Sequence, residues 1–169
     1  MKIKNLLLIV FAFAFFSSNA QIKNKRIEDI DKHQEVLIGE CSRNGLIFMD
    51  FGHKMKFYYE KYELDVKTIA KIKKKIDGIK ITIILGTWCK DSKEQVPKFL
   101  KILDELKFKD ENLTIIGVDS KKQAYVLDVE KYNIERVPTF IFYKKDKEVG
   151  RIIETPKKSL EKDMLKKIR

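Results

Sequence analysis

Two kinds of apolar spacing alternate along the chain from residue 66 onward. Apolar residues three and four positions apart lie on one face of a helix and therefore predict helices. Short continuous runs rich in β-branched residues predict strands that are buried on both faces. The expected helices cover 66–76, 96–106, 121–131 and 160–168, and the expected strands cover 81–85, 113–118, 139–143 and 148–154.

The order of these elements predicts the fold class. Strands that alternate with helices and end in a hairpin are typical of a three-layer α/β/α sandwich with a mixed β-sheet. Residues 21–64 show no clear period, and they carry many charges and a cluster of aromatic side chains. We expect short helices or irregular structure there, as an N-terminal extension to a domain at 65–169.

The first 20 residues have the order of a secretory signal peptide. Lys2 and Lys4 are followed by an unbroken apolar run at 6–16 and then by small residues that end at Ala20. We expect cleavage before Gln21 and export to the periplasm or cell envelope, or secretion. An uncleaved anchor is the alternative, although the apolar run is short for a membrane span.

Composition narrows the class of protein further. The 169 residues are 44% hydrophobic and 36% charged, which suits one compact domain. The net charge is +11, and its densest lysine clusters lie at 71–75 and 157–169 on expected helices. They are interpreted as solvated helix faces, or as sites that attract anionic envelope surfaces or acidic partners. With no nucleic-acid motif and an expected export, nucleic acid is not an expected partner.

The candidate chemistry lies where the strand at 81–85 gives way to a helix. Cys89 sits at this junction, beside the only tryptophan of the chain, Trp88. A helix N-terminus stabilises a thiolate through its free backbone N–H groups and its macrodipole. Lys90 acts in the same direction and Asp91 opposes it. Cys89 is therefore a candidate nucleophile, and an inert buried thiol is the alternative.

The residues around this junction resemble those of the thioredoxin superfamily. Residues 88–92 resemble the Trp-Cys-x-x-Cys motif, with Ser92 in place of the second cysteine. Pro97 falls where thioredoxins kink the active-site helix, and residues 137–139 resemble their cis-proline segment. The resemblance implies a thioredoxin-like fold, with Cys89 and Ser92 as catalytic residues. It also implies that the substrate backbone binds at Trp88, Val137, Pro138 and Thr139.

Three departures from the family pattern limit what this resemblance implies. Ser92 cannot form a disulfide, although its hydroxyl can donate a hydrogen bond to a thiolate. Ile83 stands where thioredoxins of the reductase type keep a buried acid for proton transfer. Glu154 or Thr155 falls near a position where a glycine usually leaves room for substrate.

Cys41, the second cysteine, lies in the extension that the resemblance does not cover. It is a possible resolving thiol for a mixed disulfide on Cys89, a possible permanent partner of Cys89, or a buried thiol. Sequence gives no Cα separation, so all three interpretations stay open.

Together these residues predict a monothiol thiol–disulfide exchange protein of the cell envelope that isomerises or reduces mixed disulfides through Cys89. A non-enzymatic peptide- or protein-binding module on the same fold is the alternative. The expected partners are proteins or small molecules that carry thiols or disulfides, and the protein is expected to be a monomer. No cofactor is expected, and the isolated His33 and His53 make no metal site.

Overall fold

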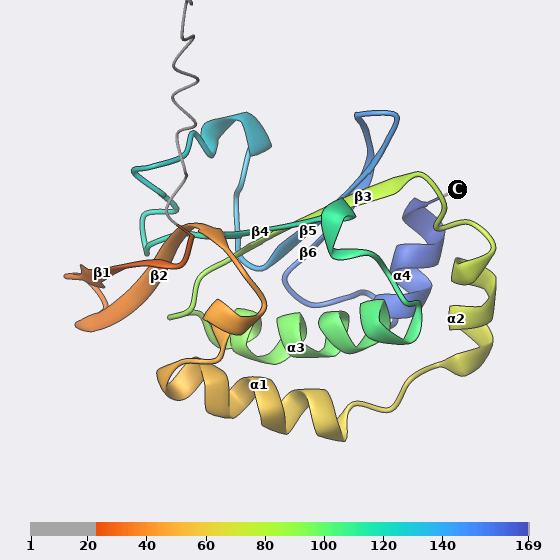
Figure 1. The fold of residues 1–169 in the computed structure, drawn as a ribbon, viewed down its shortest axis with the longest axis horizontal. Helices are drawn as coiled ribbons and strands as arrows, with labels where there is room; N and C mark the ends of the chain where they lie inside the picture. Colours follow the sequence, from red (N-terminus) through yellow and green to blue (C-terminus); the bar gives the residue numbers. More distant parts are fainter. Residues whose placement is uncertain (1–22, 169) are drawn as a thin grey trace, which may run out of the picture.

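The computed structural model describes residues 23–168, and the expected signal peptide lies outside them. Six strands form a single sheet, and four α-helices pack against it within the described residues (Figure 1). The strands are β1 (Lys25–Asp29), β2 (Gln34–Cys41), β3 (Ile79–Leu85), β4 (Leu113–Gly117), β5 (Thr139–Lys144) and β6 (Lys147–Ile153). The helices are α1 (Met49–Lys61), α2 (Val66–Lys73), α3 (Lys90–Glu105) and α4 (Leu160–Lys167), with short 3-10 turns at Asn44–Leu46, Asp110–Asn112 and Glu130–Tyr132.

The sheet is mixed, as the sequence predicted, and its strand order is β1-β2-β4-β3-β5-β6. Only β3 and β4 run parallel, and every other neighbouring pair is antiparallel. The continuous apolar run of β3 is explained by its central position, since both of its faces are covered. The loop that follows its C-terminal end carries the predicted reactive cysteine.

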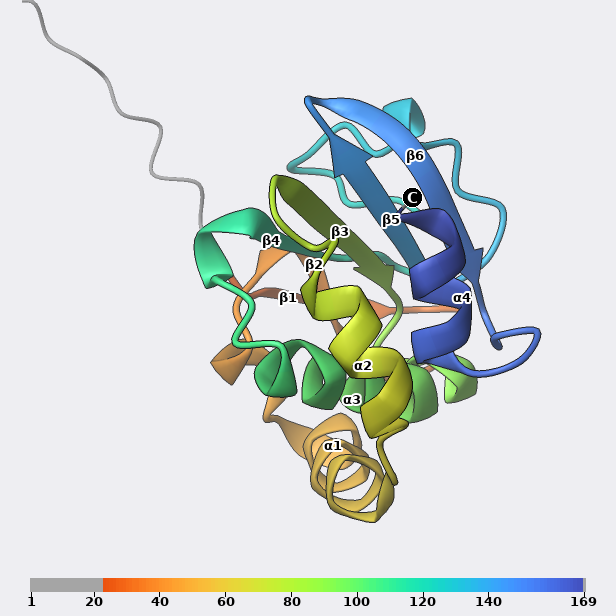
Figure 2. The same cartoon turned by 90° about the vertical axis from the view of Figure 1, so that its right-hand side faces the viewer.

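All four helices cover the same face of the sheet (Figure 2). Their apolar stripes meet the sheet in one continuous core, which contains Phe51 of α1, Ile72 of α2, Phe99 of α3 and Met164 of α4. Phe99 lies at the centre, with its ring centroid 4.4 Å from that of Phe140 on β5. This larger core accounts for the spacing of three and four that the sequence showed in α2, α3 and α4.

The other face is covered by a loop, residues 118–138. The helix expected at 121–131 is absent, and the segment has only the 3-10 turn Glu130–Tyr132. Lys122 and Tyr125 adopt positive φ, which ends a right-handed helix. The Asp119 carboxylate accepts hydrogen bonds from the Gln123 backbone at 2.7 Å and the Tyr125 hydroxyl at 2.8 Å. The α/β fold is thus confirmed, with a loop as its second outer layer.

The N-terminal extension also differs from expectation in its first half. Residues 25–41 form the β1–β2 hairpin rather than helices or irregular structure, whereas α1 follows as a helix. Strand β2 pairs with β4, so the hairpin belongs to the same sheet as the rest of the chain. The hairpin forms because β2 pairs with a strand that is distant in the sequence, and the local spacing of apolar residues does not reveal such pairing.

No helix in the described part of the chain is long and apolar enough to cross a membrane.

Candidate functional site

The loop between β3 and α3 presents Cys89 at the start of the helix. Gly86 closes this loop, because its carbonyl accepts the Cys89 backbone N–H at 2.9 Å. Cys89 is the N-cap residue of α3 in an extended conformation and is partly exposed. The first turn of α3 leaves backbone N–H groups free on this side, as at any helix start. The nucleophile expected from the sequence is therefore accessible and placed at a helix N-terminus.

The Cys89 sulfur lies against the segment that resembles a cis-proline loop. Its Sγ donates a hydrogen bond to the Val137 carbonyl oxygen at 3.2 Å. The Val137–Pro138 peptide bond is cis, as the resemblance predicted. Thr139 is buried at the start of β5, and its hydroxyl donates to the Arg136 carbonyl at 2.6 Å. The structure thus brings the predicted nucleophile and the predicted substrate-binding segment together.

Ser92 occupies the position of the missing second thiol but does not contact the sulfur by a hydrogen bond. It is fully buried, and its Oγ accepts the Gly86 backbone N–H at 3.3 Å. No hydrogen bond joins Ser92 to Cys89 among the described residues. In this structure Ser92 therefore holds the loop in shape, and the direct contact to the sulfur that we expected is not formed.

The Trp88 indole packs beside Cys89, and three neighbouring residues fix or accommodate its position. Its Nε1 donates to the Val118 carbonyl at 3.1 Å. A side chain on Gly86 would approach the ring to 2.6 Å, so the glycine makes room for it. The Lys32 ammonium lies 5.1 Å from the ring centroid, within the range of a cation–π contact. Sequence reasoning missed Gly86 and Lys32 as functional candidates. Of the two, only Gly86 lies close enough to the motif in the sequence to have been considered.

Comparison with known proteins identifies the family of this chain. A sequence profile described as thioredoxin matches residues 49–168, which is more than half of the chain. The protein belongs to the thioredoxin superfamily. The match begins at residue 49, so the family region includes α1 and starts earlier than the boundary at 65 that we expected.

Among solved structures, one with a TM-score above 0.5 supports the same fold for this thioredoxin-superfamily protein. A Pseudomonas aeruginosa protein of unknown function aligns over 74% of this chain and 77% of its own, with 14% identity and a TM-score of 0.54. Fasciola hepatica thioredoxin aligns over 57% of this chain and 86% of its own, with 21% identity and a TM-score of 0.40. Malassezia sympodialis thioredoxin aligns over 55% of this chain and 80% of its own, with 22% identity and a TM-score of 0.41. No curated protein gives a significant match.

The β1–β2 hairpin reaches this thioredoxin-like site through its turn, which carries Lys32. Buried Asp29 accepts hydrogen bonds from the Ser120 backbone at 2.7 Å and hydroxyl at 2.9 Å. Burial alone would raise the pKa of Asp29, but these bonds and one from the Lys32 backbone outweigh it and lower the pKa. At the other strand, Thr87 Oγ1 accepts the Leu37 backbone N–H at 3.2 Å. The hairpin is therefore tied to both loops that border Cys89.

Glu154 is one of the two residues that the sequence placed near a glycine position of the family. Its φ of 54° lies in the left-handed region that glycine favours, and its backbone N–H donates to the Pro138 carbonyl at 2.7 Å. Its carboxylate pairs with Arg136 at 2.9 Å. The left-handed conformation favours Glu154 over Thr155 for that position, and a charged pair borders the cis-proline segment there.

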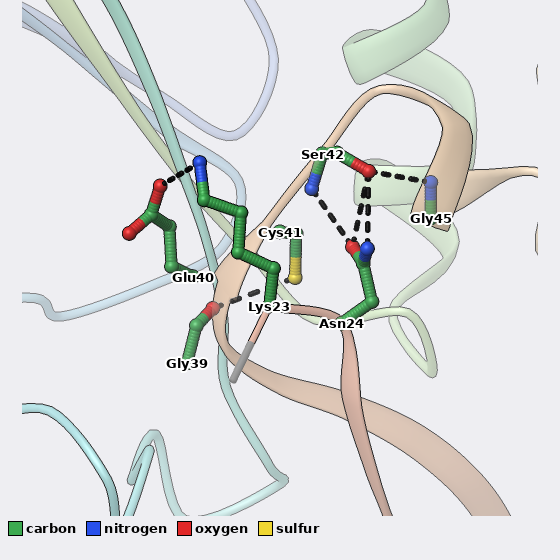
Figure 3. Close-up of polar contacts among 7 residues, drawn as sticks. All are labelled: Lys23, Asn24, Gly39, Glu40, Cys41, Ser42 and Gly45. Carbon is green, nitrogen blue, oxygen red and sulfur yellow. Dashed lines mark hydrogen bonds and ion pairs between the residues drawn. The ribbon is translucent and has the colours of Figure 1, made fainter. Parts of the chain in front are cut away.

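Cys41 lies away from this site, within the helix-covered core, and Figure 3 shows its sulfur directed at the Gly39 carbonyl. Its Sγ donates to the Gly39 carbonyl at 3.4 Å, and only 5% of the residue is exposed. Burial raises the pKa of Cys41 to about 11; a hydrogen bond from the Gly117 backbone opposes the rise and the Glu40 charge adds to it. Neither cysteine forms a disulfide within residues 23–168. This placement favours the buried-thiol interpretation over a bridge or a resolving thiol.

The remaining site candidates agree with the departures noted in the sequence. Ile83 is fully buried in the helix-covered core and supplies no proton-transfer group. Across residues 23–168 no group of three or more potential metal ligands comes together.

Proposed function

We propose that this protein is an exported monothiol thiol–disulfide exchange protein that acts through Cys89. The observation that carries the proposal is the position of its sulfur, partly exposed at the N-terminus of α3 and 3.2 Å from the Val137 carbonyl beside Pro138. A thiolate here benefits from the helix N-terminus, and an extended substrate segment has backbone partners at the same place.

The exchange step follows from the chemistry of one sulfur. A thiolate has no proton to donate, so the reactive form of Cys89 gives up its bond to the Val137 carbonyl. The sulfur then attacks one sulfur of a substrate disulfide, forming a mixed disulfide and releasing the other substrate sulfur as a thiolate. A second thiol, from the substrate or from a small external thiol, attacks the mixed disulfide and returns Cys89 to its starting state.

The surroundings of Cys89 favour isomerisation or removal of a small-thiol adduct over net reduction by the protein alone. Ser92 cannot be oxidised, and Cys41 is buried in the other core cluster. No intramolecular disulfide therefore stores the two electrons that a dithiol thioredoxin transfers. Isomerisation needs no such store, and adduct removal takes its electrons from the external thiol.

Export is proposed from the pattern of the first 20 residues, and an envelope site would supply disulfide-bearing substrates. Mass spectrometry of the exported protein is expected to find a chain that begins at Gln21. Retention of Met1 in the exported material would contradict cleavage.

The exchange proposal is tested by the lifetime of a mixed disulfide on Cys89. The protein is reacted with an aromatic disulfide that releases a coloured thiolate, and the adduct is followed by mass spectrometry. We expect a long-lived adduct on the wild type, because no neighbouring thiol can release it. Ser92→Cys is expected to release it rapidly, since the second thiol makes the reaction intramolecular.

Two further variants complete the test. Cys89→Ala is expected to form no adduct at this site, and Cys41→Ala is expected to leave the adduct lifetime unchanged. Release in the wild type that disappears in Cys41→Ala would instead make Cys41 the resolving thiol. If the wild type, Ser92→Cys and Cys89→Ala all behave alike, exchange is not the function and the protein is a binding module on this fold.

A further inference from the structure

A hollow lies between β6 and α4. This groove has a volume of about 590 Å³, within the range of small-molecule sites (roughly 300–1,000 Å³). None of its lining residues belongs to the loops around Cys89. Its cationic residues are Arg151, Lys157, Lys158, Lys162, Lys166 and Lys167.

The positive charge of this groove is poorly compensated within the described residues. Asp163 is the only acidic residue of its lining, and its carboxylate accepts the Lys157 backbone N–H at 2.6 Å. Lys162 is 3.8 Å from Asp65, at the outer limit of an ion pair. Lys158, Lys166 and Lys167 form no ion pair with any residue of 23–168. An anion that enters the groove therefore meets several ammonium groups and a single carboxylate, that of Asp163.

Placing these lysines around one groove costs helix α4 some stability. Lys162 and Lys166 are four residues apart on α4, where like charges destabilise a helix. The stem of Lys167 packs on β6 at Gly150, where an added Cβ would lie 2.6 Å from its Cδ. Lys167 is thus half-buried at the groove, while an ordinary surface lysine extends into water.

The type of cationic side chain without an ion-pair partner among the described residues of the groove indicates which class of anion it would bind. The Arg151 guanidinium, which would read a carboxylate with two parallel bonds, already pairs in this way with Glu148 at 2.7 and 2.6 Å. The free cations are ammonium groups, which bind phosphate as point charges. We infer that the β6–α4 groove binds a small anion that carries two or more neighbouring phosphate groups. Such a ligand would come either from a soluble phosphate compound or from the headgroup of an anionic phospholipid.

The inference does not depend on the exchange chemistry of Cys89, so it can fail or hold separately. Inorganic pyrophosphate serves as the probe in a calorimetric titration of the protein at low salt. We expect binding that weakens as salt is added, because it rests on charge. Citrate, a carboxylate anion of similar charge, is expected to bind more weakly.

A pair of matched variants locates the site. Lys158→Gln combined with Lys166→Gln removes two exposed charges from the groove and is expected to weaken pyrophosphate binding about tenfold. Lys73→Gln combined with Lys74→Gln removes two exposed charges from the C-terminal end of α2, outside the groove, and is expected to change binding less than about twofold. The labelling rate of Cys89 is expected to stay unchanged in both.

Vesicles identify the source of the phosphate. Binding to vesicles that contain cardiolipin, whose headgroup carries two phosphates, but not to phosphatidylcholine vesicles, with loss in the groove variant, would assign the lipid headgroup. Pyrophosphate binding without vesicle binding would assign a soluble ligand. Absence of pyrophosphate binding, equal binding of citrate, or an equal loss in the Lys73 and Lys74 variant would overturn the inference.

Discussion

The helix-covered face of the sheet and the loop-covered face each hold one cysteine, in opposite surroundings. On the first face four helices pack over a core in which Cys41 is almost completely buried. On the second face residues 118–138 cover a smaller cluster, and Cys89 packs at its edge, partly exposed. The two thiols are thus separated by the sheet itself.

This difference shows how one fold makes one cysteine inert and another available. Burial disfavours the thiolate of Cys41, whereas Cys89 lies at a helix start beside backbone acceptors. Hydrogen bonds of Asp29 and Thr87 tie the β1–β2 hairpin to the loops around Cys89, and a hydrogen bond from Trp88 to Val118 joins those two loops. The larger apolar core thus lies on one face of the sheet, and the proposed chemistry lies on the other.

The largest expected effect separates the two cores. Phe99→Ala removes a ring at the centre of the helix-covered core and is expected to lower the free energy of unfolding by about 3–5 kcal/mol. Val129→Ala, in the loop-covered cluster, is expected to cost about 1.5 kcal/mol or less. Urea denaturation followed by circular dichroism measures both, and equal losses would contradict the asymmetry.

The next effect concerns the two thiols directly. At pH 8 in the native protein, iodoacetamide is expected to label Cys89 at least about a hundredfold faster than Cys41, equivalent to about 2.7 kcal/mol. Peptide mass spectrometry resolves the two sites. Labelling in denaturant is the control and is expected to make the rates similar. Comparable native rates would show that Cys41 is accessible and would reopen its interpretation as a resolving thiol.

A smaller effect follows from the raised pKa of Cys41. Because burial raises the pKa of Cys41 to about 11 in the folded protein from its ordinary value of 9.0, the unfolded chain loses this proton first as pH rises. The contribution is fully present below pH 9 and is lost toward pH 11, at up to about 1.4 kcal/mol per pH unit. Unfolding titrations from pH 8 to 11 are expected to show this fall in the wild type. The difference from Cys41→Ala isolates it, and parallel curves would contradict it.

The smallest effect tests the crowded edge of the Cys89 site. Glu154→Gly relieves a positive φ and removes the carboxylate beside Pro138. It also adds conformational entropy to the unfolded chain, which opposes the gain. The free energy of unfolding is therefore expected to change by less than about 1 kcal/mol. Labelling of Cys89 is expected to accelerate, by less than about tenfold. Lys145→Gly is the matched control, since Lys145 also has positive φ, 49°, in the β5–β6 turn. Equal acceleration in both variants would show that Glu154 does not restrict access.

Elements that depend on local pattern were predictable, and elements that depend on distant partners were not. Strands β3, β4 and β5 and helices α2, α3 and α4 followed from apolar spacing, because each buries its own stripe or run. The segment 121–131 has a helix-compatible composition but folds as a loop, held by the side chain of Asp119 and by positive φ at Lys122 and Tyr125. The β1–β2 hairpin is a strand pair because β4 offers an edge to β2.

The same division holds for the candidate site. In the sequence, Cys89 and Trp88 were candidates because they lie between an expected strand and an expected helix, and the resemblance to thioredoxins added Ser92 and Pro138. Only the tertiary structure decided that Ser92 binds Gly86 rather than the sulfur, and that Lys32 reaches Trp88 from the hairpin. It alone also placed Cys41 in the core on the other side of the sheet. Hydrogen bonds and burial depend on which segments meet in space, and the meeting of residues far apart in the chain leaves no local spacing to detect.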